Sequence, residues 1–203
     1  MNRSTELLII RHGQTEWNVA RRLQGHSDIP LNEKGMEQAL ALADALREES
    51  FNAIYSSDLQ RALKTAEAIA KWHNLPVTAD AAFRERSYGV VEGLSREELK
   101  SRYPDDHAAW YSADPDHRFP AGTRPSESIR TLHNRAIDAI FRIAGQHAGE
   151  KIILVAHFGI IEAAYRAAND LPLDIRNRVP VANTSINRFL VRDTQIKLLE
   201  WGG

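Results

Sequence analysis

The clearest pattern along the chain is a pair of uninterrupted apolar stretches, each of which runs directly into charged or ionisable residues. The first lies within Glu6–Arg11 (ELLIIR) and is followed by His12. The second is Lys151–Ala156 (KIILVA), which is followed by His157. Continuously apolar strands are typical of parallel sheets that are covered on both faces. We therefore predict two buried strands at these positions.

Apolar residues elsewhere recur at the spacing of amphipathic helices. Asn32 is expected to cap a helix that continues to about Glu49, and Ser57 is expected to cap a helix over about Asp58–His73. The remaining predicted helices lie over about residues 95–103, over residues 126–146 and from about residue 159.

Shorter strands are expected between and after these helices, at Phe51–Tyr55 and Val77–Thr78. Near the end of the chain, Thr184–Val191 and Gln195–Trp201 flank a two-residue turn and read as a hairpin near a sheet edge. Strands that alternate with helices predict an α/β fold. We expect a three-layer α/β/α sandwich with a mainly parallel central sheet.

The domain organisation is expected to be simple. No linker, repeat or low-complexity tract divides the chain, so we predict one domain over residues 1–203. Residues 82–125 contain prolines, glycines and aromatic residues without a sustained periodicity. Such a stretch is typical of a loop-rich insertion or cap, and in a compact domain it is more often functional than idle.

Composition narrows the classes of partner. The 203 residues are 43% hydrophobic and 26% charged, with a formal net charge of −1 and no cysteine. There is no basic surplus for nucleic acid or an anionic membrane, so any anion must be bound by a local cluster. No stretch approaches the ~18 apolar residues that span a bilayer, and thiolate chemistry and disulfides are excluded. We expect a cytoplasmic protein with no nucleic acid and no membrane as a partner.

Ionisable side chains gather where the two apolar strands are expected to end. Ligands of open α/β sheets bind beyond the carboxyl ends of the strands, so Arg11, His12 and His157 are predicted at one edge. Arg61 falls in the first turn of a predicted helix, where a cation opposes the helix dipole and needs another reason, such as an anion. Glu85 lies between two arginines, and for that stretch alone a solvated charge run is the simpler interpretation.

Each of these residues also has an ordinary interpretation. A single histidine at a strand end is more often a hydrogen-bonded polar residue than a functional one. A metal site would need a third ligand, and the chain has no HxH or HExxH spacing. Two strand-end histidines beside an arginine weaken the ordinary interpretation considerably.

The residues around these positions form an ordered series of motifs. RHGQTEWN is followed by QGHSDIPLNEKGMEQA, YSSDLQRALKTA, FRERSYGVVEG, SES and ILVAHFG. The first block resembles the RHGxTxxN signature of the histidine phosphatase superfamily, also called the phosphoglycerate mutase-like family, and the series covers nearly the whole chain. The resemblance implies a phosphoglycerate mutase-like fold and an enzyme that uses no metal and no other cofactor.

The resemblance also implies roles for individual residues. His12 would be the nucleophile that carries the phosphoryl group as phosphohistidine, and Glu85 would donate the proton to the leaving oxygen. The chemistry needs a neutral imidazole whose other ring nitrogen donates to a backbone carbonyl, and arginine forks that grip phosphate oxygens. The residues expected around the phosphate are Arg11, Asn18, Gln24, Gly25, Arg61 and His157.

Three activities remain open at this point: hydrolysis, phosphoryl transfer of the phosphoglycerate mutase type, and phosphate binding by an inactive interaction module. A mutase must exclude water and hold its substrate in two orientations. By the resemblance, such mutases are longer chains with a basic, substrate-gripping insertion after the EG motif. Here the corresponding interval, Leu94–Ser126, is short and has no paired arginines. Because all the catalytic candidates are present, an inactive module is disfavoured. We predict a metal-independent phosphomonoesterase that hydrolyses small phosphorylated metabolites.

The pocket is expected to differ from the common family pattern in three places. Val91 stands where a tryptophan is frequent, Phe158 replaces a common glycine, and TRPSES (123–128) replaces a glycine pair before ES. None of these changes removes a catalytic group. Phe158 and residues 123–126 are expected to alter the shape of the pocket.

Several residues of the predicted insertion have two interpretations. His107, Arg118 and Arg124 could meet a substrate carboxylate or be solvated loop charges. Three aromatic residues of the insertion could line an acceptor pocket or pack the insertion itself. They are Trp110, Tyr111 and Phe119.

The C-terminal hairpin also has two interpretations. It could form the interface of a homodimer, or it could simply end the sheet.

Overall fold

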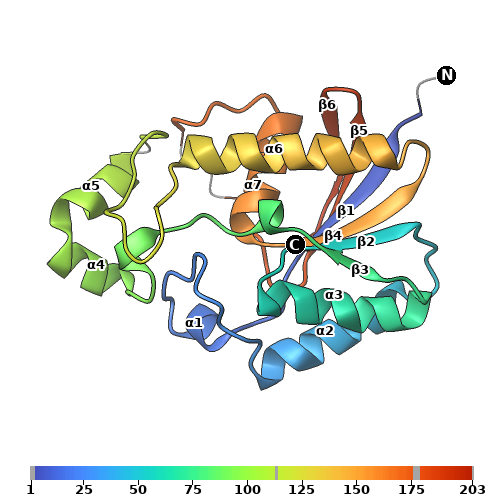
Figure 1. The fold of residues 1–203 in the computed structure, drawn as a ribbon, viewed down its shortest axis with the longest axis horizontal. Coiled ribbons are helices and arrows are strands. Elements are labelled where there is room, and N and C mark those ends of the chain that lie inside the picture. Colours follow the sequence, from blue (N-terminus) through green and yellow to red (C-terminus); the bar gives the residue numbers. More distant parts are fainter. Residues whose placement is uncertain (1–2, 113, 176–178, 203) are drawn as a thin grey trace.

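The fold is built on one six-stranded sheet, with the strand order β3-β2-β4-β1-β5-β6 (Figure 1). The computed structural model describes residues 3–112, 114–175 and 179–202. β1 to β4 are mutually parallel where they pair, β5 runs antiparallel to β1, and β6 completes a hairpin at the edge. The predicted mainly parallel sheet and edge hairpin are confirmed. The strands are β1 (Thr5–Arg11), β2 (Ala53–Ser56), β3 (Val77–Ala79), β4 (Lys151–Ala156), β5 (Ile186–Arg192) and β6 (Gln195–Trp201).

Helices cover both faces of this sheet, which confirms the three-layer α/β/α architecture (Figure 1). α2 (Glu33–Leu46) and α3 (Gln60–His73) pack on one face. α6 (Ile129–Gln146) and α7 (Phe158–Ala168) pack on the other. In the part of the chain that the structure describes, no helix has both the length and the apolar character needed to cross a membrane.

Strand β1 explains why its sequence is apolar at every position. Leu7 and Ile9 belong to the core beneath α6 and α7, whereas Leu8 and Ile10 belong to the core beneath α2 and α3. All four side chains are fully buried. At about 1.5–3 kcal/mol for each buried side chain, this packing holds the strand firmly from both faces. The residues that follow the strand therefore leave the sheet from a well-defined position.

Residues 82–125 form a small body beside the sheet rather than a simple loop. They include η2 (Gly89–Val91), α4 (Arg96–Arg102) and α5 (Pro104–Ser112), and both helices lie apart from the sheet (Figure 1). A separate core of Val91, Leu94, Leu99 and Phe119 holds this body together. The short helix expected after Ser95 is confirmed. α5 was not predicted, because it has no buried residue and hence no apolar stripe to give a helical signal.

The start of α3 differs from the sequence prediction. Ser57 does not cap it: α3 begins at Gln60, and Leu59 occupies the N-cap position without a side-chain hydrogen bond. The Oγ of Ser57 instead accepts a hydrogen bond from the backbone N–H of Leu59 at 3.3 Å. The prediction failed because a serine two positions before the N-cap has the same sequence signature as a true cap.

The start of α6 and a short helix near the N-terminus also differ from prediction. α6 begins at Ile129, with Ser128 as its N-cap, and the hydroxyl of Ser126 donates to the carbonyl of Phe119 instead. The four-residue helix α1 (Glu16–Val19) was not predicted. It is too short to show periodicity, and its capping box is supplied by Thr15 and the helix residue Asn18.

Two glycines let the turn after β1 pack directly on the start of α2. A Cβ added to Gly13 would lie 2.5 Å from the carbonyl oxygen of Gly35, and a Cβ added to Gly35 would lie 2.0 Å from the carbonyl oxygen of Gln14. Neither neighbour is a flexible side chain that could move aside. The close approach of two backbones therefore requires glycine at both positions.

We predict that Gly35→Ala destabilises the protein although alanine is the better helix former. The clash with the Gln14 carbonyl should cost about 1–3 kcal/mol in the free energy of unfolding, measured by urea denaturation. Gly145 in α6 provides the matched control, because nothing lies within 4 Å of an added Cβ there. Gly145→Ala should stabilise by about 0.5–1 kcal/mol. Equal effects of the two substitutions would contradict the packing described here.

Candidate active site

A cavity of about 520 Å³ opens beyond the carboxyl end of β1. It collects seven of the eight residues predicted for the site, which come from segments far apart in the sequence. His157, the eighth, is fully buried beside His12, with ring centroids 5.1 Å apart. The seven lining residues are Arg11, His12, Asn18, Gln24, Gly25, Arg61 and Glu85.

His12 is held in one tautomer and in its neutral form. Its Nδ1 lies 2.7 Å from the carbonyl oxygen of Gly13. Because a carbonyl only accepts, Nδ1 must carry the hydrogen, and Nε2 keeps its lone pair. Burial lowers the pKa of His12 well below its ordinary value, and the positive charges of Arg61 and Arg11 lower it further. A neutral imidazole with a free Nε2 therefore lines the cavity.

His157 follows β4 and is fully buried behind His12. Burial lowers its pKa well below the ordinary value, and Arg61, His12 and Arg11 add to that effect. Within the described residues, neither of its ring nitrogens has a hydrogen-bond partner. Buried polar atoms without partners are costly to a folded protein, so their presence beside a cavity marks a position prepared for polar contacts.

The guanidinium groups of Arg61 and Arg11 belong to the lining of the cavity. Arg61, in the first turn of α3, is fully buried and donates to the carbonyl oxygens of Ser27 at 2.9 Å and Gly25 at 2.8 Å. Burial lowers its pKa to about 10, so it stays charged at neutral pH. Arg11 donates to the carbonyl of Val181 at 2.6 Å. Among the described residues no carboxylate pairs with either arginine within 4.0 Å, so both charges remain available to a bound anion.

Glu85 lies on an irregular segment, and its carboxylate reaches the start of α7. Both carboxylate oxygens lie 3.2 Å from the backbone N of Gly159, and Oε1 also accepts from the backbone N–H of Arg86 at 2.8 Å. A Cβ on Gly159 would lie 2.3 Å from Oε1 of Glu85. Glycine at that position therefore permits the carboxylate to approach the helix. Glu85 is brought to the cavity although sequence spacing alone favoured a solvated charge run.

The arginines on either side of Glu85 serve the fold instead. Arg84 forms a two-pronged pair with Asp58, with distances of 2.7 and 2.6 Å. Arg86 is buried and donates to the carbonyl oxygens of Glu127 and His117 at 2.8 and 2.9 Å. Of the three residues only Glu85 lines the cavity, in keeping with the rule that neighbouring side chains of an extended segment point to opposite sides.

Asn18, Gln24 and Gly25 line the cavity in ways that sequence could not specify. The Oδ1 of Asn18 accepts from the backbone N–H of Thr15 at 3.1 Å, and the Oε1 of Gln24 accepts from the Thr15 hydroxyl at 3.0 Å. Because both amide oxygens are used in this way, the NH₂ groups are the ends available to an anion. Gly25 has φ +54 and offers its carbonyl to Arg61.

Three residues of the insertion that could meet a substrate carboxylate or be solvated loop charges lie outside the lining of the cavity. Arg118 donates to the Ser126 carbonyl at 2.9 Å, and Arg124 donates to the His26 carbonyl at 2.7 Å. Neither arginine lines the cavity, and nor does His107. Nothing in the sequence around these three residues distinguishes a side chain that contacts the protein from one that contacts a ligand.

Of the aromatic candidates, Trp110 lines the cavity, Phe119 is buried in the small core, and Tyr111 is exposed and not part of the lining. Phe158 lines the cavity, as its departure from the family pattern suggested. The lining residues that sequence reasoning missed are Trp17, Arg21, Arg22, Leu23, Tyr88 and Arg96.

The missed residues come from α1, the loop after it and the body of residues 82–125. Trp17 lies on the unpredicted helix α1 and packs on Gly93, where an added Cβ would lie 3.1 Å from its ring. Arg21 has φ 52, a left-handed conformation that is unusual for arginine. Arg22 is engaged by Glu98 at 2.7 Å. Neither the helix nor the turn had a periodic signal, so the sequence did not reveal these residues.

The described residues contain no group of three or more His, Asp or Glu side chains that could hold a metal ion. The chemically distinctive groups are instead a neutral histidine with a free Nε2, a second buried histidine, two buried guanidinium groups and a carboxyl group. Such a set can bind a phosphoryl group, attack its phosphorus and exchange a proton with an oxygen bonded to it.

Comparisons with known proteins point to the same chemistry. The family model of the histidine phosphatase superfamily (branch 1) matches residues 7–203. Two Arabidopsis thaliana proteins are similar: phosphoglycerate mutase-like protein 4 is 38% identical over 93% of this chain and 80% of its own, and the metal-independent phosphoserine phosphatase is 36% identical over 97% and 81%.

A solved structure is similar throughout. The phosphoserine phosphatase of Entamoeba histolytica, in complex with 3-phosphoglyceric acid, superposes with a TM-score of 0.85 and 28% identity. The match covers 98% of this chain and 97% of that one. Fold, motif order and extent all agree, and the chain belongs to the histidine phosphatase superfamily.

Proposed function

We propose that this protein is a metal-independent phosphomonoesterase that hydrolyses small phosphorylated metabolites through a phosphohistidine on His12. The observation that carries the proposal is the state of His12: it is neutral, its tautomer is set by Gly13, and it is flanked by the buried Arg61 and the partly buried Arg11, neither of which pairs with a carboxylate of the described residues. An anionic phosphoryl group is attracted to that position, and a lone pair is available there to attack it.

In the first step, Nε2 of His12 attacks phosphorus in line, and a P–N bond forms as the bond to the leaving oxygen breaks. The leaving oxygen takes the proton of the Glu85 carboxyl group, so an alcohol departs rather than an alkoxide. Arg11 and Arg61 hold the charge that is spread over the three equatorial oxygens. The N–H of Nδ1 keeps donating to Gly13, which stabilises the positive charge that develops on the ring.

In the second step, a water molecule gives a proton to the Glu85 carboxylate. The oxygen of that water attacks phosphorus as the P–N bond breaks. Phosphate leaves, His12 is neutral again and Glu85 is again protonated. The carboxyl group thus acts as an acid in one step and as a base in the other, and the net reaction consumes one water for each ester.

The size and lining of the cavity suggest what the leaving group resembles. About 520 Å³ leaves space for an organic group beyond the phosphoryl group. The aromatic residues Trp17, Tyr88 and Trp110 line the cavity together with the cations Arg21 and Arg96. We propose a compact metabolite whose organic part carries a negative group, in keeping with relatives named for phosphoserine and found with 3-phosphoglyceric acid. A homodimer and a cytoplasmic location stay predictions.

We expect the protein to release p-nitrophenol from p-nitrophenyl phosphate at an undiminished rate in EDTA. The His12→Ala variant should lose at least about a thousandfold of this activity, because the nucleophile is gone. Continuous absorbance assays with both proteins make the comparison. Activity that EDTA removes, or that survives in His12→Ala, would refute the proposed mechanism.

The same preparation distinguishes hydrolysis from phosphoryl transfer between substrate hydroxyls. With 3-phosphoglycerate and catalytic 2,3-bisphosphoglycerate, we expect phosphate to be released without efficient formation of 2-phosphoglycerate. Efficient isomerisation with no phosphate release would instead assign the mutase activity.

The neutral state of the buried histidines predicts how stability depends on pH. The pKa of His157 in the folded protein is lowered, chiefly by burial, so below about pH 6.5 the unfolded chain binds a proton that the folded one does not. The free energy of unfolding therefore falls as pH falls. Between about pH 7.5 and 5.5, the parent protein should lose more stability than His157→Asn, by on the order of 1 kcal/mol. Urea denaturation at both pH values measures this difference, and equal losses would show that His157 is protonated when folded.

A further inference from the structure

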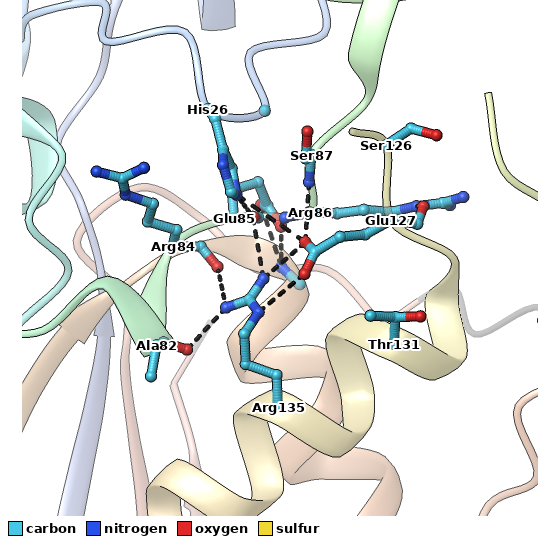
Figure 2. Close-up of polar contacts among 12 residues, drawn as sticks. His26, Ala82, Arg84, Glu85, Arg86, Ser87, Ser126, Glu127, Thr131 and Arg135 are labelled. Atoms are coloured by element: carbon cyan, nitrogen blue, oxygen red, sulfur yellow. Dashed lines mark hydrogen bonds and ion pairs between the residues drawn. The ribbon is translucent and has the colours of Figure 1, made fainter. Parts of the chain in front are cut away.

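The segment that carries Glu85 depends on a side chain from outside the cavity. Between the short turn η1 (Ala81–Phe83) and η2 the backbone belongs to no helix or strand, so carbonyl groups of η1 and of this stretch need donors from elsewhere. Arg135 on α6 supplies them. Its Nη1 donates to the carbonyl oxygens of Ala82 at 2.7 Å and Arg84 at 3.0 Å, and its Nη2 donates to that of Glu85 at 3.3 Å (Figure 2).

Arg135 is itself fixed by Glu127. The Nε and Nη2 of Arg135 donate to the two carboxylate oxygens of Glu127 at 2.9 and 2.7 Å, a two-pronged geometry that sets the plane of the guanidinium group. Burial acts to raise the pKa of Glu127, but the hydrogen bonds and charge of Arg135 outweigh it and the pKa is lowered. Glu127 is therefore ionised, and the pair is mostly shielded from solvent, with side-chain exposures of 23% and 16%.

The pair also holds the backbone on the far side of Glu85. Oε2 of Glu127 accepts from the backbone N–H of Ser87 at 3.0 Å, as Figure 2 shows. Nε2 of His26 donates to the carbonyl of Glu85 at 2.7 Å. This bond links the Glu85 segment to the loop of His26 and Ser27, to which Arg61 also donates. The backbone before, at and after Glu85 is thus held by one connected network, and neither Arg135 nor Glu127 lines the cavity.

We propose that Arg135 and Glu127 are positioning residues that hold the Glu85 carboxyl group where it can give its proton to the leaving oxygen. The inference rests on the proposed phosphatase function and adds residues that act only through Glu85. The Glu85 side chain has its own contacts with Gly159 and Arg86, but these fix the carboxylate only while the backbone from which it extends keeps its place. Loss of the guanidinium group would leave the carbonyls of Ala82 and Arg84 without their donor and that of Glu85 with His26 alone, and would let that backbone move.

A displaced proton donor has a specific kinetic consequence. An alkyl phosphate must expel a basic alkoxide unless the oxygen is protonated as it leaves, whereas p-nitrophenolate leaves readily without a proton. The value of kcat/KM reports only the steps up to the first departure, so the role of Glu85 in the second step does not enter it. Displacement of a catalytic group by about 1 Å can reduce the rate by roughly a hundredfold. The deficit should therefore depend on the leaving group.

The test measures kcat/KM for Arg135→Gln with an alkyl ester, phosphoserine, and an aryl ester, p-nitrophenyl phosphate. We expect a loss of about 10–100-fold with phosphoserine and less than about threefold with the aryl ester. Glu127→Gln keeps an acceptor for Ser87 but loses its charge, so a smaller loss with the same preference is expected. Arg135→Lys keeps the charge and should restore part of the activity toward phosphoserine.

Arg130→Gln is the matched control. Arg130 lies on the same helix and forms a similar two-pronged pair, with Asp116 at 2.8 and 3.0 Å, but it touches no part of the Glu85 segment. Its ratio of the two kcat/KM values should equal that of the parent protein. Urea denaturation of each variant shows that the folded protein is being assayed. If Arg135→Gln does not fold, Glu127→Gln and Arg135→Lys decide the question by the same ratio.

The outcomes separate this inference from the proposed function. Equal losses with the two esters, or no loss with either, would overturn the positioning role, because a merely structural contact has no reason to distinguish leaving groups. A parent protein without His12-dependent hydrolysis of p-nitrophenyl phosphate would overturn the phosphatase proposal itself. A leaving-group-dependent deficit in Arg135→Gln that is absent from Arg130→Gln supports both.

Discussion

The site depends on placing two positive charges in a buried position without giving either of them an anionic partner. Arg61 is fully buried and Arg11 is partly so, and both use backbone carbonyls as acceptors instead of a carboxylate. Unpaired buried charges are unfavourable, so the surrounding fold must supply the stability that holds them there. Burial is the main reason that the pKa values of His12 and His157 are lowered, and the same charges lower them further. One electrostatic arrangement thus attracts an anionic phosphoryl group and keeps the proposed nucleophile neutral.

The α/β sheet makes this arrangement possible. β1 and β4 are neighbours and pair in parallel, from Glu6 with Lys151 to Arg11 with Ala156, so His12 and His157 leave the sheet side by side. Burial of β1 on both faces fixes the exit of the strand, and the glycines at positions 13 and 35 let the turn pack tightly on α2. Glu85 arrives from an irregular segment and needs a different support, which α6 provides through Arg135.

The parts of this structure that sequence predicts best are those that repeat a simple physical pattern. The apolar runs before His12 and His157 predict buried parallel strands, and the rule for carboxyl ends of strands places both histidines together. Arg61 was suspected because its charge opposes the helix dipole, and burial at the cavity accounts for it. Glu85 was recognised through the family motif and not through its local pattern, because its surroundings are set by contacts with residues about 50–75 positions away.

What sequence reasoning missed has equally physical causes. Trp17 lies on a helix of four residues, too short for any periodicity, and Arg21 sits in a left-handed turn. Arg118 and Arg124 had the charge expected of ligand-binding residues, but Nη1 of each donates to a backbone carbonyl, that of Ser126 and that of His26. Arg135 has no sequence signal of its own on its amphipathic helix, since the backbone carbonyls that it binds become its neighbours only in the folded chain.

The central claim, that the tautomer set by Gly13 makes Nε2 of His12 the nucleophile, is tested most directly by trapping the phosphorylated enzyme. Rapid quenching in alkali during turnover, followed by phosphorus NMR and peptide mass spectrometry, identifies both the residue and the nitrogen. The account predicts an alkali-stable, acid-labile phosphoryl group on Nε2 of His12 and none in His12→Ala. A phosphoryl group on Nδ1, on another residue, or turnover without any phosphorylated enzyme would contradict it.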